Sequence, residues 1–238
     1  MSKKKKKRSK AVYHVEFVGL PTSGKTTLYR TIRDRDDLLS DREVVPLIQR
    51  RKLKKIRLCL LIPYLLVRHI RSFIFITSFY IRYLSLNTFN LRVFKITIKL
   101  FLLTKYRKLD TDMVFVADGV LHMLIAVQYK KITKIEDVMR EFVQWYEKRY
   151  TAIVYMDLTK EEFITRFTQR HQDKPNPILS KMTDSEKTAL MERMYAQHKI
   201  LLRVIQNKAE TPVQVIDGEK PLQENAETVA RFIEKHVG

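Results

Sequence analysis

The chain has 238 residues, of which 45% are hydrophobic and 30% charged, and its formal net charge is +20. The hydrophobic fraction excludes a wholly disordered chain, and the length suits one globular domain, or one domain that carries a sizeable insertion. The single cysteine, Cys59, excludes a disulfide framework and a thiolate metal cluster, so we expect a reducing, cytoplasmic setting. The lysine-rich start has the pattern of a basic tail rather than of a secretory signal.

The positive charge is concentrated in two segments. Residues 1–10 hold seven basic side chains, and residues 44–109 hold fifteen and no acidic one. The remainder has 24 basic and 26 acidic residues, so it is nearly neutral. We therefore divide the chain into a basic flexible tail (1–10), a nearly neutral core (11–49 and 108–238) and a basic helical insertion (50–107).

Strand patterns alternate with helical patterns along the core. Strands are predicted at 12–18, 44–48, 113–117, 151–156 and 213–216, and helices at 24–36, 135–148, 161–170, 185–206 and 221–236. This alternation predicts an α/β fold in three layers, with a five-stranded parallel sheet covered by helices on both faces. Four of the five glycines follow predicted strand ends, where open parallel sheets bind their ligands.

One motif carries specific chemistry. The segment Gly19-Leu-Pro-Thr-Ser-Gly24-Lys25-Thr26 matches G-x-x-x-x-G-K-[ST], the P-loop or Walker A motif, between a predicted strand and a predicted helix. In such a loop the backbone N–H groups cradle phosphate, Lys25 reaches the β- and γ-phosphates, and the Thr26 hydroxyl binds Mg²⁺. A plain glycine turn is the alternative. The residues expected to bind ATP here are Gly19, Leu20, Pro21, Thr22, Ser23, Gly24, Lys25, Thr26 and Thr27.

This opening resembles the P-loop kinases of small molecules, the nucleoside and nucleotide kinase group that includes thymidylate and adenylate kinases. Phe115-Val-Ala-Asp118-Gly119 resembles the end of their third strand, and Ile216-Asp217-Gly218 resembles their last strand with the loop that packs on adenine. Residues 155–170 resemble the strand and lid helix whose arginines face the ATP phosphates. The resemblance implies an ATP- and Mg²⁺-dependent kinase that transfers the γ-phosphoryl group to a nucleoside-, nucleotide- or sugar-like acceptor.

Each of the other candidate site residues could instead have a purely structural role. Asp118 would hold Mg²⁺ or accept the acceptor's proton, or it would cap the next helix. Arg166 and Arg170 would stabilise the transferring phosphoryl group, or they would lie on a solvated helix face. We expect His122 to be an ordinary packed or surface histidine and Asp157 to cap the helix after it. The arginine that follows Asp-Gly in adenylate-like kinases is absent, which argues against a nucleoside monophosphate acceptor.

The basic insertion allows two interpretations. Its uninterrupted apolar runs are too short to span a bilayer, and its pattern fits two or three helices. These helices would form an acceptor lid buried against the core, or they would bind an anionic membrane surface at the inner face. The aromatic side chains expected to touch the membrane are Phe73, Phe75, Phe79, Tyr80 and Tyr83.

A second class of function stays open beside the kinase. The chain could be a P-loop ATPase switch whose hydrolysis controls binding of the basic segments to membrane or nucleic acid. Nucleic-acid binding through the insertion is disfavoured, because its apolar density is too high for a surface that tracks phosphates. The sequence does not indicate an oligomeric state.

Overall fold

A computed structural model describes residues 13–34, 44–46, 69–88, 90–95, 97–98, 113–117, 119–130, 134–146, 152–173, 175 and 179–237. The tail at 1–10, Asp118 and much of the insertion lie outside these residues.

All five predicted strands are present, with ends that differ by one or two residues. They are β1 (Tyr13–Gly19), β2 (Val44–Pro46), β3 (Met113–Ala117), β4 (Ala152–Asp157) and β5 (Val213–Asp217). The helices are α1 (Lys25–Arg33), α3 (Ile70–Tyr83), α5 (Val120–Ala126), α6 (Ile135–Tyr146), α7 (Lys160–Asp173), α8 (Asp184–Lys208) and α9 (Leu222–Val237), with a 3₁₀ turn η3 (Leu179–Lys181). A capping box begins α8: the Thr183 hydroxyl accepts from the backbone N–H of Glu186, whose carboxylate accepts from that of Thr183.

The five strands form one parallel sheet in the order β2-β3-β1-β4-β5. This order places β1 at the centre, paired with β3 on one side and β4 on the other. The loop that follows β1 therefore emerges at the middle of the carboxyl edge of the sheet, where parallel α/β folds bind ligands. The α/β fold with a five-stranded parallel sheet is thus confirmed.

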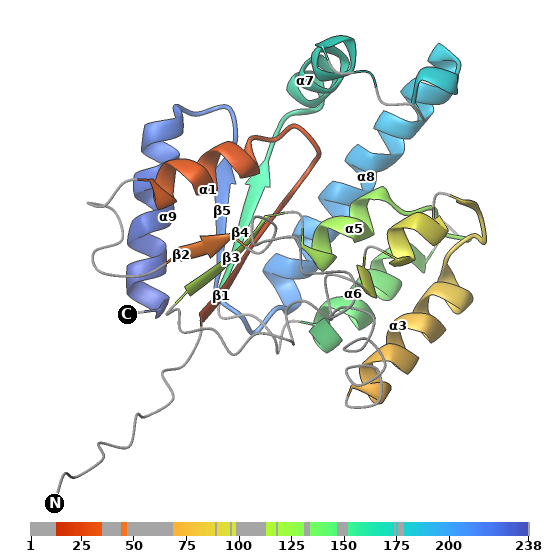
Figure 1. Ribbon diagram of the computed structural model, residues 1–238, viewed down its shortest axis with the longest axis horizontal. Coiled ribbons are helices and arrows are strands. Elements are labelled where there is room, and N and C mark those ends of the chain that lie inside the picture. Colours follow the sequence, from red (N-terminus) through yellow and green to blue (C-terminus); the bar gives the residue numbers. More distant parts are fainter. Residues whose placement is uncertain are drawn as a thin grey trace, which may run out of the picture.

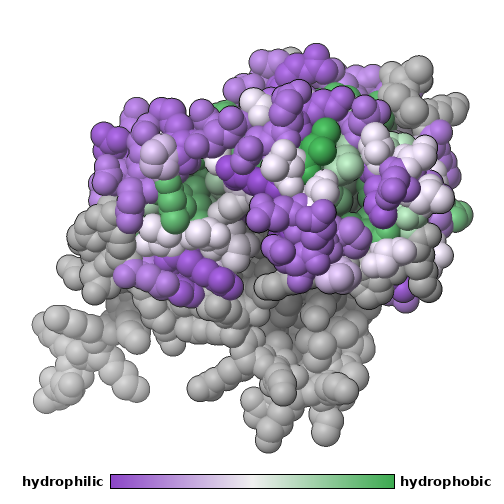
Figure 2. Space-filling view, turned by 90° about the horizontal axis from the view of Figure 1, so that it is seen from above, coloured by the Kyte–Doolittle hydropathy of each residue, from purple (hydrophilic) through white to green (hydrophobic). Residues whose placement is uncertain are grey.

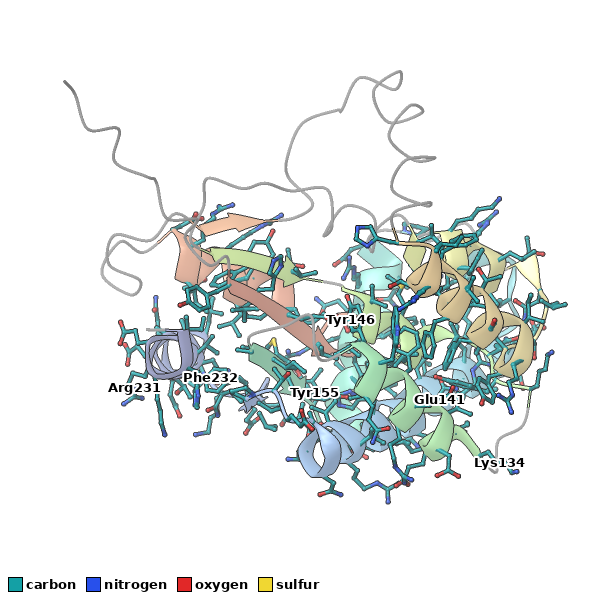
Figure 3. The ribbon with its side chains drawn as sticks, turned by 90° about the horizontal axis from the view of Figure 1, so that it is seen from below. Lys134, Glu141, Tyr146, Tyr155, Arg231 and Phe232 are labelled. Atoms are coloured by element: carbon teal, nitrogen blue, oxygen red, sulfur yellow. The ribbon has the colours of Figure 1, made fainter. Side chains whose placement is uncertain are left out.

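Helices cover both faces of the sheet (Figure 1). Successive residues of a strand point to opposite faces. Val15 and Phe17 of β1 belong to the core that the sheet shares with α1 and α9, whereas Val18 belongs to the larger core under α5, α6 and α8. Figure 3 shows Phe232 of α9 pointing toward the strands and Arg231 pointing away. Most residues of β1 and β4 are buried, so both faces of these strands are covered, which explains their continuous apolar runs.

The described part of the insertion packs on the larger core. On α3, Phe79 is only 2% exposed and meets Phe142 of α6 edge to face at 4.8 Å between ring centres, while Phe75 stacks on Trp145 at 4.3 Å. The hydroxyl of Tyr83, the last residue of α3, donates to the carboxylate of Glu141 on α6. The prediction that the aromatic side chains of this segment touch a membrane is therefore wrong for Phe79 and Tyr80, which are buried, whereas Phe73, Phe75 and Tyr83 are half-buried.

Candidate active site

The loop between β1 and α1 contains three residues with positive φ angles. Thr22 and Gly24 have positive φ angles of 68° and 91°, and Gly24 is the N-cap of α1 without a side-chain cap. Gly19 has a φ of 150°, and a Cβ there would lie 2.6 Å from the carbonyl oxygen of Met156. Only glycine permits this approach to β4. The first-turn N–H groups of α1 have no acceptor within the helix, so they and the helix dipole face the loop.

Lys25 and His122 both bond to the backbone of this loop. The Lys25 ammonium is 3% exposed, and its Nζ donates to the carbonyl oxygens of Gly19 at 3.1 Å and Leu20 at 2.7 Å. Nδ1 of His122 lies 2.6 Å from the same Gly19 oxygen, which can only accept, so Nδ1 carries a proton. His122 is thus a packed histidine as expected, and it ties α5 to the P-loop.

The loop after β5 lies against the P-loop. A Cβ on Gly218 would sit 3.4 Å from the carbonyl oxygen of Ser23 and 2.9 Å from the Leu158 side chain. The exposed Asp217 accepts from the backbone N–H of Glu219 at 2.9 Å, which holds this turn. The structure therefore brings Gly218 to the P-loop, while the Asp217 carboxylate has a local role in the turn.

Asp157 is the centre of a polar cluster that the sequence did not reveal. Its carboxylate accepts from Nε2 of His198 at 2.9 Å and from Nζ of Lys199 at 2.7 and 2.8 Å. The Tyr155 hydroxyl lies 2.8 Å from Nδ1 of His198, between β4 and α8 (Figure 3). The expectation that Asp157 caps α7 is wrong, because the Thr159 hydroxyl accepts from the N–H of Glu162 and takes that role.

The protonation states in this cluster follow from burial and charge. Burial opposes ionisation of Asp157, but the hydrogen bonds from His198 and Lys199 outweigh it and lower its pKa to about 2. Burial lowers the pKa of His198, and the charges of Lys199 and Lys25 act in the same direction. The Asp157 carboxylate can only accept, so Nε2 of His198 carries a proton, while the Tyr155 hydroxyl donates to the backbone carbonyl oxygen of His198 at 2.8 Å.

A buried glutamate organises the segment between β3 and α5. Glu16 on β1 is fully buried, and its Oε1 accepts from the backbone N–H of Leu121 at 2.9 Å. A Cβ on Gly119 would lie 2.2 Å from that oxygen, so only glycine fits beside the carboxylate. Glu16 thus supplies an acceptor oxygen for a backbone N–H in the first turn of α5, the capping role that the sequence-based alternative gave to Asp118.

Arg166 and Arg170 lie on α7, above the carboxyl edge of the sheet (Figure 1). Arg166 pairs with Glu162 at 2.5 Å, and its charge helps to lower the pKa of Glu219, after the larger effect of hydrogen bonds from Thr159. Arg170 is exposed in the last turn. No described contact joins either arginine to the P-loop. The surface of this edge is mostly hydrophilic, broken by small hydrophobic patches (Figure 2).

Two polar side chains of α8 are buried or half-buried, and the sequence pattern did not indicate them. Arg193 is half-buried and Gln197 is 2% exposed, one helical turn apart. Within the described residues, Nε of Arg193 and Oε1 of Gln197 are buried without a hydrogen-bond partner, and burial lowers the pKa of the guanidinium. The helix that carries them, α8, packs against α5 and α6. The helical pattern of a sequence predicts which positions are buried, but it does not predict which buried polar atoms have no hydrogen-bond partner.

Three solved structures align with most of this chain. Deoxyadenosine kinase from M. mycoides with bound dATP aligns with 92% of this chain and 98% of its own, at 11% identity and a TM-score of 0.48. Its structure with bound dCTP aligns with 93% of this chain and 99% of its own, at 13% identity and a TM-score of 0.49. Shikimate kinase from Bacteroides thetaiotaomicron aligns with 93% of this chain and 98% of its own, at 14% identity and a TM-score of 0.45. At these identities and TM-scores, the similarity carries no weight for function.

No protein-family model matches the chain, and no curated protein sequence matches it significantly.

Proposed function

We propose that the chain is an ATP- and Mg²⁺-dependent kinase that transfers the γ-phosphoryl group to a small-molecule acceptor. The observation that carries this proposal is the P-loop, with its positive φ angles at Thr22 and Gly24 and the buried Lys25 ammonium on the loop. The cradle fits a polyphosphate, because uncapped N–H groups and a cation converge on one loop. Bound ATP would supply the phosphoryl group, and Mg²⁺ would neutralise charge on its oxygens.

The proposal gives each residue of the P-loop site a defined role. Lys25 would exchange the carbonyl oxygens of Gly19 and Leu20 for phosphate oxygens, which are stronger acceptors because they are charged. Thr26, half-buried at the start of α1, and Asp118 would hold Mg²⁺. No group of three histidine, cysteine or acidic side chains gathers in the described ranges, and Mg²⁺ in kinases needs few protein ligands.

Arg166 and Arg170 would stabilise the transferring phosphoryl group from α7. The Arg166–Glu162 pair is partly exposed, so it can be exchanged for phosphate at little cost. Gly218 would pack beside the adenine, because its loop already touches the P-loop at Ser23, and Asp217 would hold that loop in shape.

The acceptor would lie between α5 and α8, beyond the P-loop. Arg193 gives this wall a half-buried cation that no described carboxylate balances. The panel of acceptors used to test the function should therefore include compounds with a carboxylate or phosphate, besides neutral nucleosides and sugars. Acceptor-dependent formation of ADP and of a phosphorylated acceptor is the direct test of the proposal.

Replacing Asp118 tests the metal or base role. We expect Asp118→Asn to lower turnover by at least about a hundredfold, because the amide keeps the shape but cannot bind Mg²⁺ as a carboxylate or take a proton. The measurement is the rate of ADP release at saturating acceptor. Asp137→Asn, on an exposed part of α6, serves as the control and should keep normal turnover. Near-normal turnover in Asp118→Asn would remove Asp118 from the site.

A further inference from the structure

One side of α3 is apolar although it faces solvent. Ile70, Ile74 and Ile81 are 48%, 55% and 58% exposed. They lie four and seven residues apart, so they share one side of the helix, opposite the buried Ile76 and Phe79. We call these three isoleucines the outer stripe of α3. The segment after α3 continues the pattern, with Leu86 at 71% and Leu91 at 49% exposure.

Exposed basic side chains accompany the outer stripe, and the described acidic side chain that contacts α3 is Glu141 of α6, which accepts from the Tyr83 hydroxyl. Arg71 and Arg82 flank the stripe on α3, and Arg92 and Lys95 follow in the next helical segment. None of these four forms an ion pair within the part of the chain that the structure describes, and residues 44–109 contain no aspartate or glutamate. Arg82 lies over the Tyr83 ring, with 5.2 Å from Cζ to the ring centre.

We propose that the outer stripe of α3 and its arginines bind an anionic lipid surface, with α3 parallel to the membrane plane. Exposed aliphatic side chains bordered by basic ones are what a helix needs to insert one side among acyl chains while its cations meet headgroup phosphates. A helix of 14 residues is about 21 Å long, which suits lying on a surface. None of the described helices is long and apolar enough to cross a bilayer.

The charge of the segment favours lipid over a protein groove. A protein groove that accepts an apolar helix side can carry either sign of charge at its rim, whereas an anionic leaflet attracts every cation of this face at once. Residues 1–10 would add seven further basic side chains to the same attraction. The contact surface differs from the sequence expectation, because aliphatic and not aromatic side chains would enter the lipid.

Sedimentation of the full chain with vesicles tests the proposal. The vesicles contain phosphatidylcholine with phosphatidylserine, or phosphatidylcholine alone, at low and at high salt. We expect binding to the anionic vesicles that weakens with salt. The triple variant Ile70→Ser, Ile74→Ser, Ile81→Ser and the double variant Arg71→Gln, Arg82→Gln should each weaken binding by about tenfold or more. All replaced side chains are exposed, so the unfolding temperatures should stay close to that of the parent.

Matched controls come from the opposite side of the molecule. Leu222 is 39% exposed on α9, and Arg231 of the same helix points away from the sheet (Figure 3). Leu222→Ser and Arg231→Gln should bind vesicles as the parent does. The proposal is overturned if the parent does not sediment with anionic vesicles, or if the α3 variants bind as well as the parent. It is equally overturned if deletion of residues 2–10 alone removes all binding.

Discussion

Lys25→Met should abolish measurable phosphoryl transfer, lowering turnover by at least about a thousandfold, and should greatly weaken ATP binding. Methionine keeps the length and the buried position of the side chain, so the change removes the charge and the donors. The variant also loses the hydrogen bonds to the carbonyl oxygens of Gly19 and Leu20, so the loop itself is expected to be less stable. Turnover is measured as ADP release, and ATP affinity by calorimetric titration.

Two comparisons separate a ligand-binding role of Lys25 from a structural one. Lys235→Met, at an exposed position of α9, should behave as the parent in both assays. Circular dichroism of Lys25→Met should show the secondary structure of the parent. Unchanged ATP affinity in a folded Lys25→Met protein would contradict the assignment of the P-loop as the ATP site.

Asp157→Asn should lower the free energy of unfolding by about 2 kcal/mol at neutral pH. The pKa of this carboxyl group falls from 3.8 to about 2 on folding, and each unit corresponds to about 1.4 kcal/mol. The asparagine side chain still accepts from Nε2 of His198, but it no longer neutralises Lys199. Urea unfolding followed by circular dichroism gives the difference. Asp184→Asn, which replaces a fully exposed partner of Lys187, is the control and should change little.

The pH dependence of this difference has a fixed sign. Because the folded pKa of Asp157 is lowered, its contribution is fully present above about pH 4 and is lost as the pH falls through 2. The gap between the parent and Asp157→Asn should therefore shrink below about pH 4. The lowered pKa of His198 acts in the same direction below about pH 6.5, because the unfolded chain then binds more protons than the folded one. A gap that stays constant from pH 6 to pH 3 would contradict this account of the cluster.

Sequence alone predicted the parts of the fold that depend on short-range patterns. The apolar runs of β1, β3 and β4 and the G-x-x-x-x-G-K-[ST] spacing are local, so strand positions and the loop between β1 and α1 could be read directly. The sequence also predicted that Gly19 and Gly218 lie at the same edge of the sheet, because the carboxyl ends of parallel strands meet there.

Contacts between distant residues could not be predicted in the same way. Asp157 and His198 are 41 residues apart, and the Glu16 oxygen that binds the N–H of Leu121 belongs to a residue 105 positions earlier. Nothing in the local pattern distinguishes such a pair from a helix cap. The two sides of α3 were equally ambiguous, because isoleucine and phenylalanine alternate around it and hydrophobicity alone does not say which side meets α6.

The central claim is that the P-loop serves phosphoryl transfer to a small molecule, and acceptor-dependent ADP release tests it most directly. The protein is incubated with ATP and Mg²⁺ and a panel of nucleosides, nucleotides, sugars and small carboxylates, with ADP, free phosphate and phosphorylated acceptor measured together. The kinase proposal predicts that one acceptor class raises ADP release and yields an equal amount of phosphorylated acceptor, in the parent but not in Lys25→Met. Release of ADP and free phosphate in equal amounts, with no dependence on any acceptor, would contradict it and identify an ATPase.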